Sequence, residues 1–191
     1  MSELTITHNG IAQTAKTGSN LKKGVVKRVT PTVIAGTTED NDVMFDATEI
    51  SNAVIEKGGC SKLLGITIID KDGEQVDMDL IFMKVQTNFG TAGSASNITD
   101  ANLQAAKVLG ALTIDWTDHH VTFAQDANNA SIWTSGGMAG TGNNGTTFPI
   151  LLEAESNSTS VFFTAIVNTA SNADFAATDD LTFVFHIEYL D

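Results

Sequence analysis

Residues 63–85 constrain the fold of this chain more than any other stretch of the sequence. Their second half alternates apolar residues with aspartates, and this period of two is typical of a strand with one buried face. Ile81 and Met83 make the other face apolar as well, so the strand belongs in the middle of a sheet covered on both sides. The sequence Asp-Lys-Asp-Gly at 70–73 separates two strand-like runs. It predicts a β-hairpin turn with the glycine at positive φ and the aspartates facing solvent.

Short runs rich in β-branched and aromatic residues recur along the chain and, with the two runs in 63–85, give about nine expected strands. The other expected strands are 25–35, 43–50, 111–116, 119–124, 148–154, 160–168 and 181–190. Polar or glycine-rich segments predict turns or loops at 36–42, 88–97, 126–131, 135–147 and 171–180. Pro31 lacks a backbone donor, so it places the first strand at a sheet edge or divides it. This pattern predicts an all-β fold, an antiparallel β-sandwich of jelly-roll type.

A single short helix is expected at 99–109, where Thr99 or Asp100 can cap its start and Gly110 its end. Residues 1–24 are polar and weakly patterned, and we interpret them as an N-terminal arm. The remaining residues, 25–191, have the length of one β-sandwich domain.

The charge of the chain is distributed unevenly. The net charge is −13, yet residues 1–28 contain five of the ten basic residues and one of the 23 acidic residues. An acidic body repels phosphate backbones, so we expect no nucleic-acid binding. The basic segment suits contact with an acidic neighbour, such as another copy of this chain.

These observations single out candidate partner-contact residues. The basic candidates are Lys16, Lys22, Lys23, Lys27 and Arg28, and Asn143 and Asn144 lie in the glycine-rich loop 135–147. Loop 88–97 is a further contact candidate. Each loop is also compatible with an ordinary surface loop.

We expect no membrane span, because no apolar run approaches the roughly 18 residues that a span requires. The first 20 residues lack the apolar segment of a signal peptide. Cys60 is the single cysteine, so no intrachain disulfide is possible, and an inert thiol is expected.

Possible metal sites are weak. Counting from Asp70, the fifth, sixth and twelfth positions of an EF-hand loop hold Glu74, Gln75 and Ile81. The motif requires glycine at the sixth position and glutamate at the twelfth, so a calcium loop is not expected. His119 and His120 point to opposite faces of a strand and cannot bind one metal together. One of them can pair with His186 or Asp118, and a trimer axis can collect three copies of one histidine. One exposed histidine and one histidine in an interface or the core is the favoured interpretation. We expect no cofactor.

The order of motifs from residue 46 onwards resembles that of a known group of proteins. Residues 46–54 read Asp-Ala-Thr-Glu-Ile-Ser-Asn-Ala-Val, and they precede Gly58-Gly59 and the strand that runs into the Asp-Lys-Asp turn. This order resembles a group of tailed-bacteriophage virion proteins, and the similarity extends over 25–191 through Asn-Ile-Thr-Asp at 97–100 and the terminal strand. The resemblance implies a β-sandwich subunit of the virion, a capsid decoration or auxiliary head protein without catalytic residues. Residues 1–24 depart from the pattern.

The sequence therefore predicts a non-enzymatic structural protein located in the virion and assembled in the host cytoplasm. Its expected partners are the major capsid protein or other virion proteins. We also expect a homo-oligomer, such as a trimer. An alternative is a carbohydrate- or receptor-binding module of a tail or head fibre that uses Trp116, Trp133 or Tyr189, although core packing is favoured for the tryptophans. An enzyme with a histidine-based metal site is the least favoured hypothesis.

Overall fold

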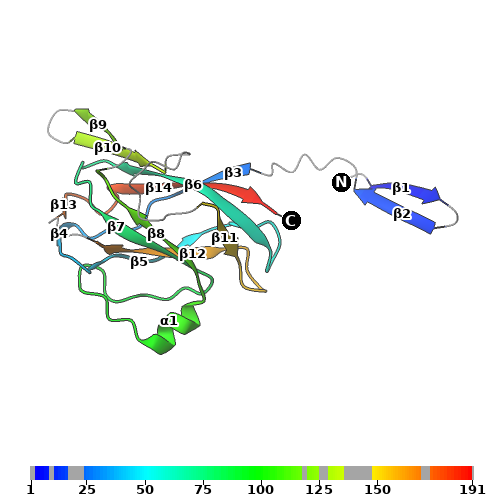
Figure 1. Cartoon of the computed structure of the whole chain (residues 1–191), viewed down its shortest axis with the longest axis horizontal. Helices are drawn as coiled ribbons and strands as arrows, with labels where there is room; N and C mark the ends of the chain where they lie inside the picture. The colour runs from blue at the N-terminus through cyan, green and yellow to red at the C-terminus, as the bar shows by residue number, and fades with distance from the viewer. Residues whose placement is uncertain are drawn as a thin grey trace.

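The computed structural model describes residues 3–8, 11–16, 24–117, 120–124, 129–135, 148–168 and 173–190. Two antiparallel sheets pack face to face, and one short helix lies below the second sheet in the view of Figure 1. The predicted all-β sandwich is confirmed. The residue pairs 9–10 and 118–119 and the segments 125–128 and 136–147 are among those outside the described residues.

The first sheet has the strand order β3-β14-β6-β10-β9, with β11 also paired to β6. Its strands are β3 (Gly24–Val29), β6 (Cys60–Asp70), β9 (His120–Ala124), β10 (Asn129–Thr134), β11 (Ile150–Glu153) and β14 (Leu181–Tyr189). The second sheet has the order β5-β12-β7-β8. Its strands are β5 (Val43–Ile50), β7 (Met78–Met83), β8 (Val108–Ile114) and β12 (Val161–Val167).

The strand order is that of a jelly roll. Eight strands form its framework, and in chain order they are β3, β5, β6, β7, β8, β10, β12 and β14. The first, eighth, third and sixth of these lie side by side in one sheet, and the second, seventh, fourth and fifth in the other. This arrangement is a double Greek key, so the jelly-roll prediction is confirmed.

The predicted hairpin at 63–85 is wrong. β6 pairs with β10, β11 and β14, whereas β7 pairs with β8 and β12 in the opposite sheet. Residues 71–77 therefore cross from one sheet to the other. Both strands already have neighbours on both sides, so neither has an edge left to pair with the other. A local turn signal cannot distinguish a hairpin from such a crossing.

The carboxylate of Asp70 holds the start of this crossing. Its Oδ1 accepts hydrogen bonds from the backbone N–H of Asp72 at 3.0 Å and of Gly73 at 2.9 Å, and its Oδ2 accepts one from Gln75 at 2.8 Å. Gly73 has a φ of 76°, as the turn prediction requires. Asp70 is completely buried, which corrects the expectation that it faces solvent. Burial raises the pKa of Asp70, and the three backbone hydrogen bonds oppose that rise.

The main core lies between the two sheets and is rich in phenylalanine. The ring centroid of Phe163 on β12 lies 5.3 Å from that of Phe45 on β5 and 5.2 and 4.9 Å from those of Phe183 and Phe185 on β14. All three pairs are edge-to-face, an arrangement that aromatic rings favour. One residue of the second sheet thus packs against both sheets.

The outer face of the second sheet has its own cover. Met83 on β7 packs with Val43, Phe89 and Ala106 in a second buried cluster, and Ile81 is packed against it. Phe89 and Ala106 belong to the segment between β7 and β8, which includes α1 (Asp100–Ala106). The two-faced strand predicted from the sequence is confirmed, and the cover of its second face is part of the same chain.

The helix is shorter than predicted. Thr99 caps its start by accepting a hydrogen bond from the N–H of Asn102 at 3.2 Å. The expected end near 109 is wrong, because Lys107 adopts a left-handed conformation with a φ of 52° and β8 begins at the next residue. Pairing with β7 therefore takes precedence over another helical turn.

Three segments predicted as loops contain strands. β4 (Gly36–Thr38) pairs with β13 (Ala173–Phe175), and β10 occupies the end of the segment 126–131. These strands are short or begin with polar residues, so their pairing partners rather than their sequence make them strands. The first expected strand, 25–35, ends at Val29, before Pro31, and β3 is an edge strand, as the proline indicates.

The N-terminal region forms a separate two-stranded sheet. β1 (Glu3–His8) pairs with β2 (Ile11–Lys16) in antiparallel register. The division of the chain into an arm and a domain stays a prediction. In the described part of the chain, no helix has the length and apolar character that a membrane span needs.

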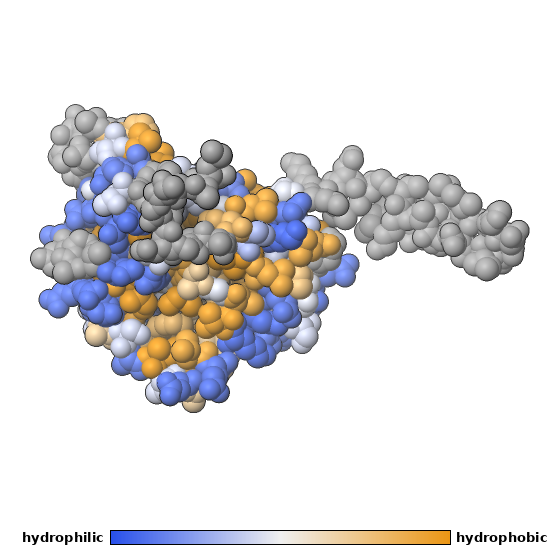
Figure 2. All heavy atoms as spheres, viewed as in Figure 1, coloured by the Kyte–Doolittle hydropathy of each residue, from blue (hydrophilic) through white to orange (hydrophobic). Residues whose placement is uncertain are grey.

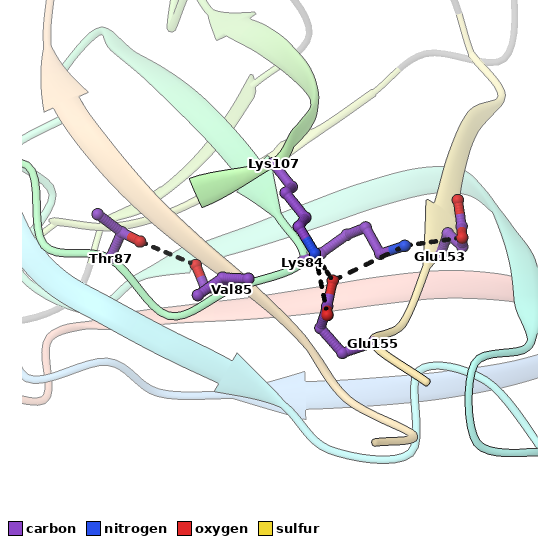
Figure 3. A network of polar contacts seen from close by, with 6 residues as sticks. All are labelled: Lys84, Val85, Thr87, Lys107, Glu153 and Glu155. Atoms are coloured by element: carbon purple, nitrogen blue, oxygen red, sulfur yellow. Dashed lines mark hydrogen bonds and ion pairs between the residues drawn. The ribbon is translucent and has the colours of Figure 1, made fainter. Parts of the chain in front are cut away.

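An ion-pair network ties the two sheets together at one edge (Figure 3). Lys84 follows β7 and its Nζ lies 2.7 Å from Glu153 Oε1 on β11 and 3.8 Å from Glu155 Oε1. Lys107 approaches the same Glu155 oxygen to 2.9 Å. The hydrogen bond to Glu153 raises the pKa of Lys84 above its ordinary value, and the charges of Glu153 and Glu155 add to this rise. The Lys107 hydrogen bond lowers the pKa of Glu155.

Replacing Asp70 with alanine removes the acceptor for three backbone N–H groups, so we expect a loss of about 2–3 kcal/mol of unfolding free energy at pH 7. Because the pKa of Asp70 is raised in the folded protein, protonation favours folding. The deficit of Asp70→Ala relative to wild type should therefore grow as the pH falls through the raised pKa towards 3.8, the ordinary value. Urea unfolding at several pH values measures both effects. Asp46→Ala, at an exposed position, is the matched control; an equal deficit there would contradict this role.

Replacing Lys84 with methionine should cost about 0.5–1 kcal/mol at pH 7, the range of a partly exposed ion pair. A lysine with a raised pKa stabilises the fold below its unfolded value of 10.5, and that contribution is lost as the pH rises through the raised value. The difference between wild type and Lys84→Met should therefore shrink above pH 10.5. Chemical denaturation from pH 8 upwards tests this, and a difference that is constant with pH would refute it.

Candidate functional site

The free edge of β3 is the candidate functional site. β3 is the last strand on its side of the first sheet and pairs with β14 alone. In an antiparallel pair, alternate residues point their N–H and C=O groups away from the partner strand. Within the described part of the chain, the backbone of β3 has no hydrogen-bond partner apart from β14. This edge therefore offers unpaired donors and acceptors.

A shallow, open groove lies beside the end of this edge. It has a volume of about 440 Å³ and lies where β3 of the first sheet comes beside the end of β5 in the second. Its lining comes from the end of β3 and from the end of β5 and the turn after it, and consists of Lys27, Arg28, Val29, Thr30, Glu49, Ser51 and Asn52.

Lys27 and Arg28 line opposite sides of the β3 edge. Val25 and Val29 pack against the main core, so Lys27, between them in the alternation, is on the inner face. It is half-buried and stands opposite Phe185 of β14. Arg28 is exposed on the outer face, opposite Val184. Neither cation forms an ion pair with another described residue.

The polar rim of the groove is held in place by hydrogen bonds. The Glu49 carboxylate accepts one from the Ser160 hydroxyl, and the Oδ1 of Asn52 accepts one from Thr159 at 3.2 Å. The backbone oxygen of Asn52 accepts a further bond from the Tyr189 hydroxyl at 2.9 Å. Asn52 has a positive φ of 51°, which asparagine tolerates better than most residues.

Sequence reasoning found the two cations of this groove but missed its rim. Glu49 lies near the end of β5, and Ser51 and Asn52 lie in the turn after it. Their local sequence pattern does not show that β3 lies alongside. The remaining contact candidates are less informative. Lys16 ends β2, and Lys22, Lys23, Asn143 and Asn144 lie outside the described residues.

Loop 88–97 is attached to the second sheet. Asn88 Oδ1 accepts a hydrogen bond from the Ala47 N–H at 2.9 Å, and Gln86, just before the loop, donates to the Ala47 oxygen at 2.9 Å. Side-chain amides of this chain thus satisfy the backbone of β5 at Ala47, where β5 is the edge strand of the second sheet. The contact role of loop 88–97 stays a prediction.

The aromatic residues considered for sugar binding are largely buried. Trp116 and Trp133 are 2% and 4% exposed, so the prediction that they pack in the core is confirmed. Trp133 also donates its Nε1–H to the Asp115 oxygen at 2.9 Å. Tyr189 uses its hydroxyl to bind Asn52, as described above. The two tryptophan rings therefore offer no open face on which a sugar stacks.

The described histidines do not belong to a cluster of potential metal ligands. His120 and His186 are exposed, and His186 Nε2 lies 3.4 Å from the Thr67 hydroxyl. His119 lies outside the described residues. Within the described residues, no group of three potential metal ligands occurs. Cys60 is half-buried at the start of β6.

A second surface of interest is apolar. Leu64 on β6 and Leu151 on β11 are 50% and 51% exposed, and Val108 on β8 is 43% exposed. Figure 2 shows apolar side chains gathered over the centre of this face, where β8 and β11 lie. The edge of β3 combines unpaired backbone groups with two adjacent cations, so it is the better defined site.

Comparison with known proteins gives little help. No model of a known protein family matches the chain, and no curated protein is significantly similar to it. Two solved structures share a weak likeness, the infectious bursal disease virus VP2 subviral particle and the Gx strain of the same virus, with TM-scores of 0.18 and 0.17 and identities of 11% and 9%. Each match covers 95% of this chain but 40% of the other, so the chain spans less than half of their length. Scores this low carry no argument about function.

The double variant Lys27→Glu, Arg28→Glu should unfold with a free energy within about 1 kcal/mol of wild type, because neither cation pairs with a described residue and only Lys27 is half-buried. Urea unfolding followed by tryptophan fluorescence measures this. Lys84→Met, which removes a paired lysine, is the comparison. A loss of about 2 kcal/mol or more in the double variant would show that these cations support the fold instead of a binding site.

Proposed function

We propose that this chain is a non-enzymatic structural component of a tailed-phage virion, a capsid decoration or auxiliary head protein. In this proposal it binds the lattice of the major capsid protein, or another virion protein, and stabilises it. It acts as a homo-oligomer, such as a trimer, and it is assembled in the host cytoplasm.

The observation that carries the proposal is the location of the groove. The free edge of β3, its two cations without described ion pairs and the β1–β2 hairpin all belong to the first 29 residues. The sandwich has a phenylalanine-rich core between the sheets, and the outer face of the second sheet is covered by the same chain. Such a division suits a protein that attaches through its N-terminal side and keeps a stable body.

The fold and the sequence give further support. Jelly rolls recur in viral capsid proteins, lectins and cupins, although fold alone does not decide function. The burial of Trp116 and Trp133 speaks against a lectin-type sugar platform. The resemblance of 25–191 to tailed-phage virion proteins favours the viral role.

A binding assay on particles tests the proposal. Particles are purified from a phage whose copy of this gene is deleted, and the full chain is added and sedimented with them. Wild type and Lys62→Glu, a single charge reversal on β6, should co-sediment. Lys27→Glu, Arg28→Glu should bind about tenfold more weakly, and a chain lacking 1–24 should fail to bind while keeping its fold.

Two results would contradict the proposal. Wild-type protein that stays in the supernatant, and that proteomics does not find in natural particles, would exclude a virion role. Unchanged association of the chain lacking 1–24 would exclude the arm as the attachment element.

A further inference from the structure

We propose that the free edge of β3 binds an extended, acidic segment of a partner protein, which joins the first sheet as an additional strand. This inference rests on the proposed function in one respect, because it takes binding of a protein partner as given. It adds the chemical character of the partner segment and the way in which that segment binds.

The backbone of β3 provides the first argument. Six residues in regular antiparallel pairing with β14 present one unpaired edge, and an exposed edge is a template for a further strand. The second sheet does not leave β5 open in this way at Ala47, since Asn88 and Gln86 occupy that backbone. In the described structure, nothing performs the same role for β3.

Charge provides the second argument. An added strand alternates its residues between the two faces of the sheet, as β3 does. Two neighbouring residues of the added strand therefore stand next to Lys27 on the inner face and Arg28 on the outer face. Carboxylates at these two positions match both cations, and each opposite-charge pair across strands contributes roughly 0.2–1 kcal/mol.

The same cations disfavour one competing occupant, the β3 strand of a second copy of this chain. Pairing of β3 with β3 of a second copy would bring Lys27 and Arg28 close to their own duplicates, and like charges across strands are destabilising. Charged residues on an edge strand are a common protection against such self-association. The edge therefore selects against itself and in favour of a segment of opposite charge.

The ends of the groove limit how the segment can lie. Pro31 has no backbone N–H and is buried, so strand pairing cannot extend past it. Glu49, Ser51 and Asn52 line the side towards β5 and bring one negative charge and several polar groups. The acidic residues of the partner segment consequently lie against Lys27 and Arg28, with uncharged polar residues towards the rim.

Peptide binding to the full chain tests this inference. The probe is a fluorescein-labelled ten-residue peptide of alternating threonine and valine with two adjacent glutamates at its centre. One control peptide has lysines in place of the glutamates, and another keeps the glutamates but is N-methylated at alternate amides, which blocks strand pairing. Fluorescence anisotropy gives the dissociation constants.

The acidic probe should bind wild type and Lys62→Glu equally, and Lys27→Glu, Arg28→Glu about tenfold more weakly. The N-methylated probe should also bind about tenfold more weakly, because it keeps the charges but loses the backbone hydrogen bonds. The lysine peptide should bind the double variant better than wild type, since both charges are reversed.

Three results would overturn the inference. Absence of binding of the acidic probe at about 1 mM would show that the edge is not a strand acceptor. Equal binding of the N-methylated probe would show that the cations attract carboxylates without strand addition. Equal binding of the lysine peptide to wild type would remove the charge argument. If particle association succeeds while the probe fails, the proposed function stands and this binding mode falls.

Discussion

Packing of Phe163 against rings from both sheets is the interaction on which the rest of the structure depends. Because Phe163 contacts Phe45 in its own sheet and Phe183 and Phe185 in the other, the two sheets are held at one separation and in one relative register. Every strand then has a defined inner face. The buried Asp70 carboxylate holds the start of the crossing through which the chain leaves β6 for β7 in the opposite sheet.

The chain covers the outer face of the second sheet but leaves the β3 edge of the first sheet unpaired, and this difference locates the candidate site. The second sheet is covered by the segment between β7 and β8, and the ion pair of Lys84 with Glu153 fastens the start of that segment to β11. The first sheet ends at β3, where the structure describes an edge with two cations and no partner strand. A partner strand can therefore reach the sandwich at the β3 edge of the first sheet.

The sequence was sufficient for the class of fold and for the faces of individual strands. Alternation around Ile81 correctly indicated a strand buried on both sides, and tryptophan placement in the core followed from strand positions. Pairing partners were not readable, because Asp-Lys-Asp-Gly has the same local signature in a hairpin and in a crossing. For the site, charge distribution identified Lys27 and Arg28, whereas the contribution of Asn52 depends on β3 and β5 lying together, which only the tertiary structure establishes.

The position of β14 has a consequence for the order of events during synthesis. β14 is the only strand in the described structure that pairs with β3, and it follows β3 by about 150 residues. Until the ribosome has released β14, β3 therefore has two unpaired edges. Pairings between such distant segments form late, because a long loop must close first. Lys27 and Arg28 place two charges on this strand, and charges of this kind hinder aggregation of a strand that is still unpaired.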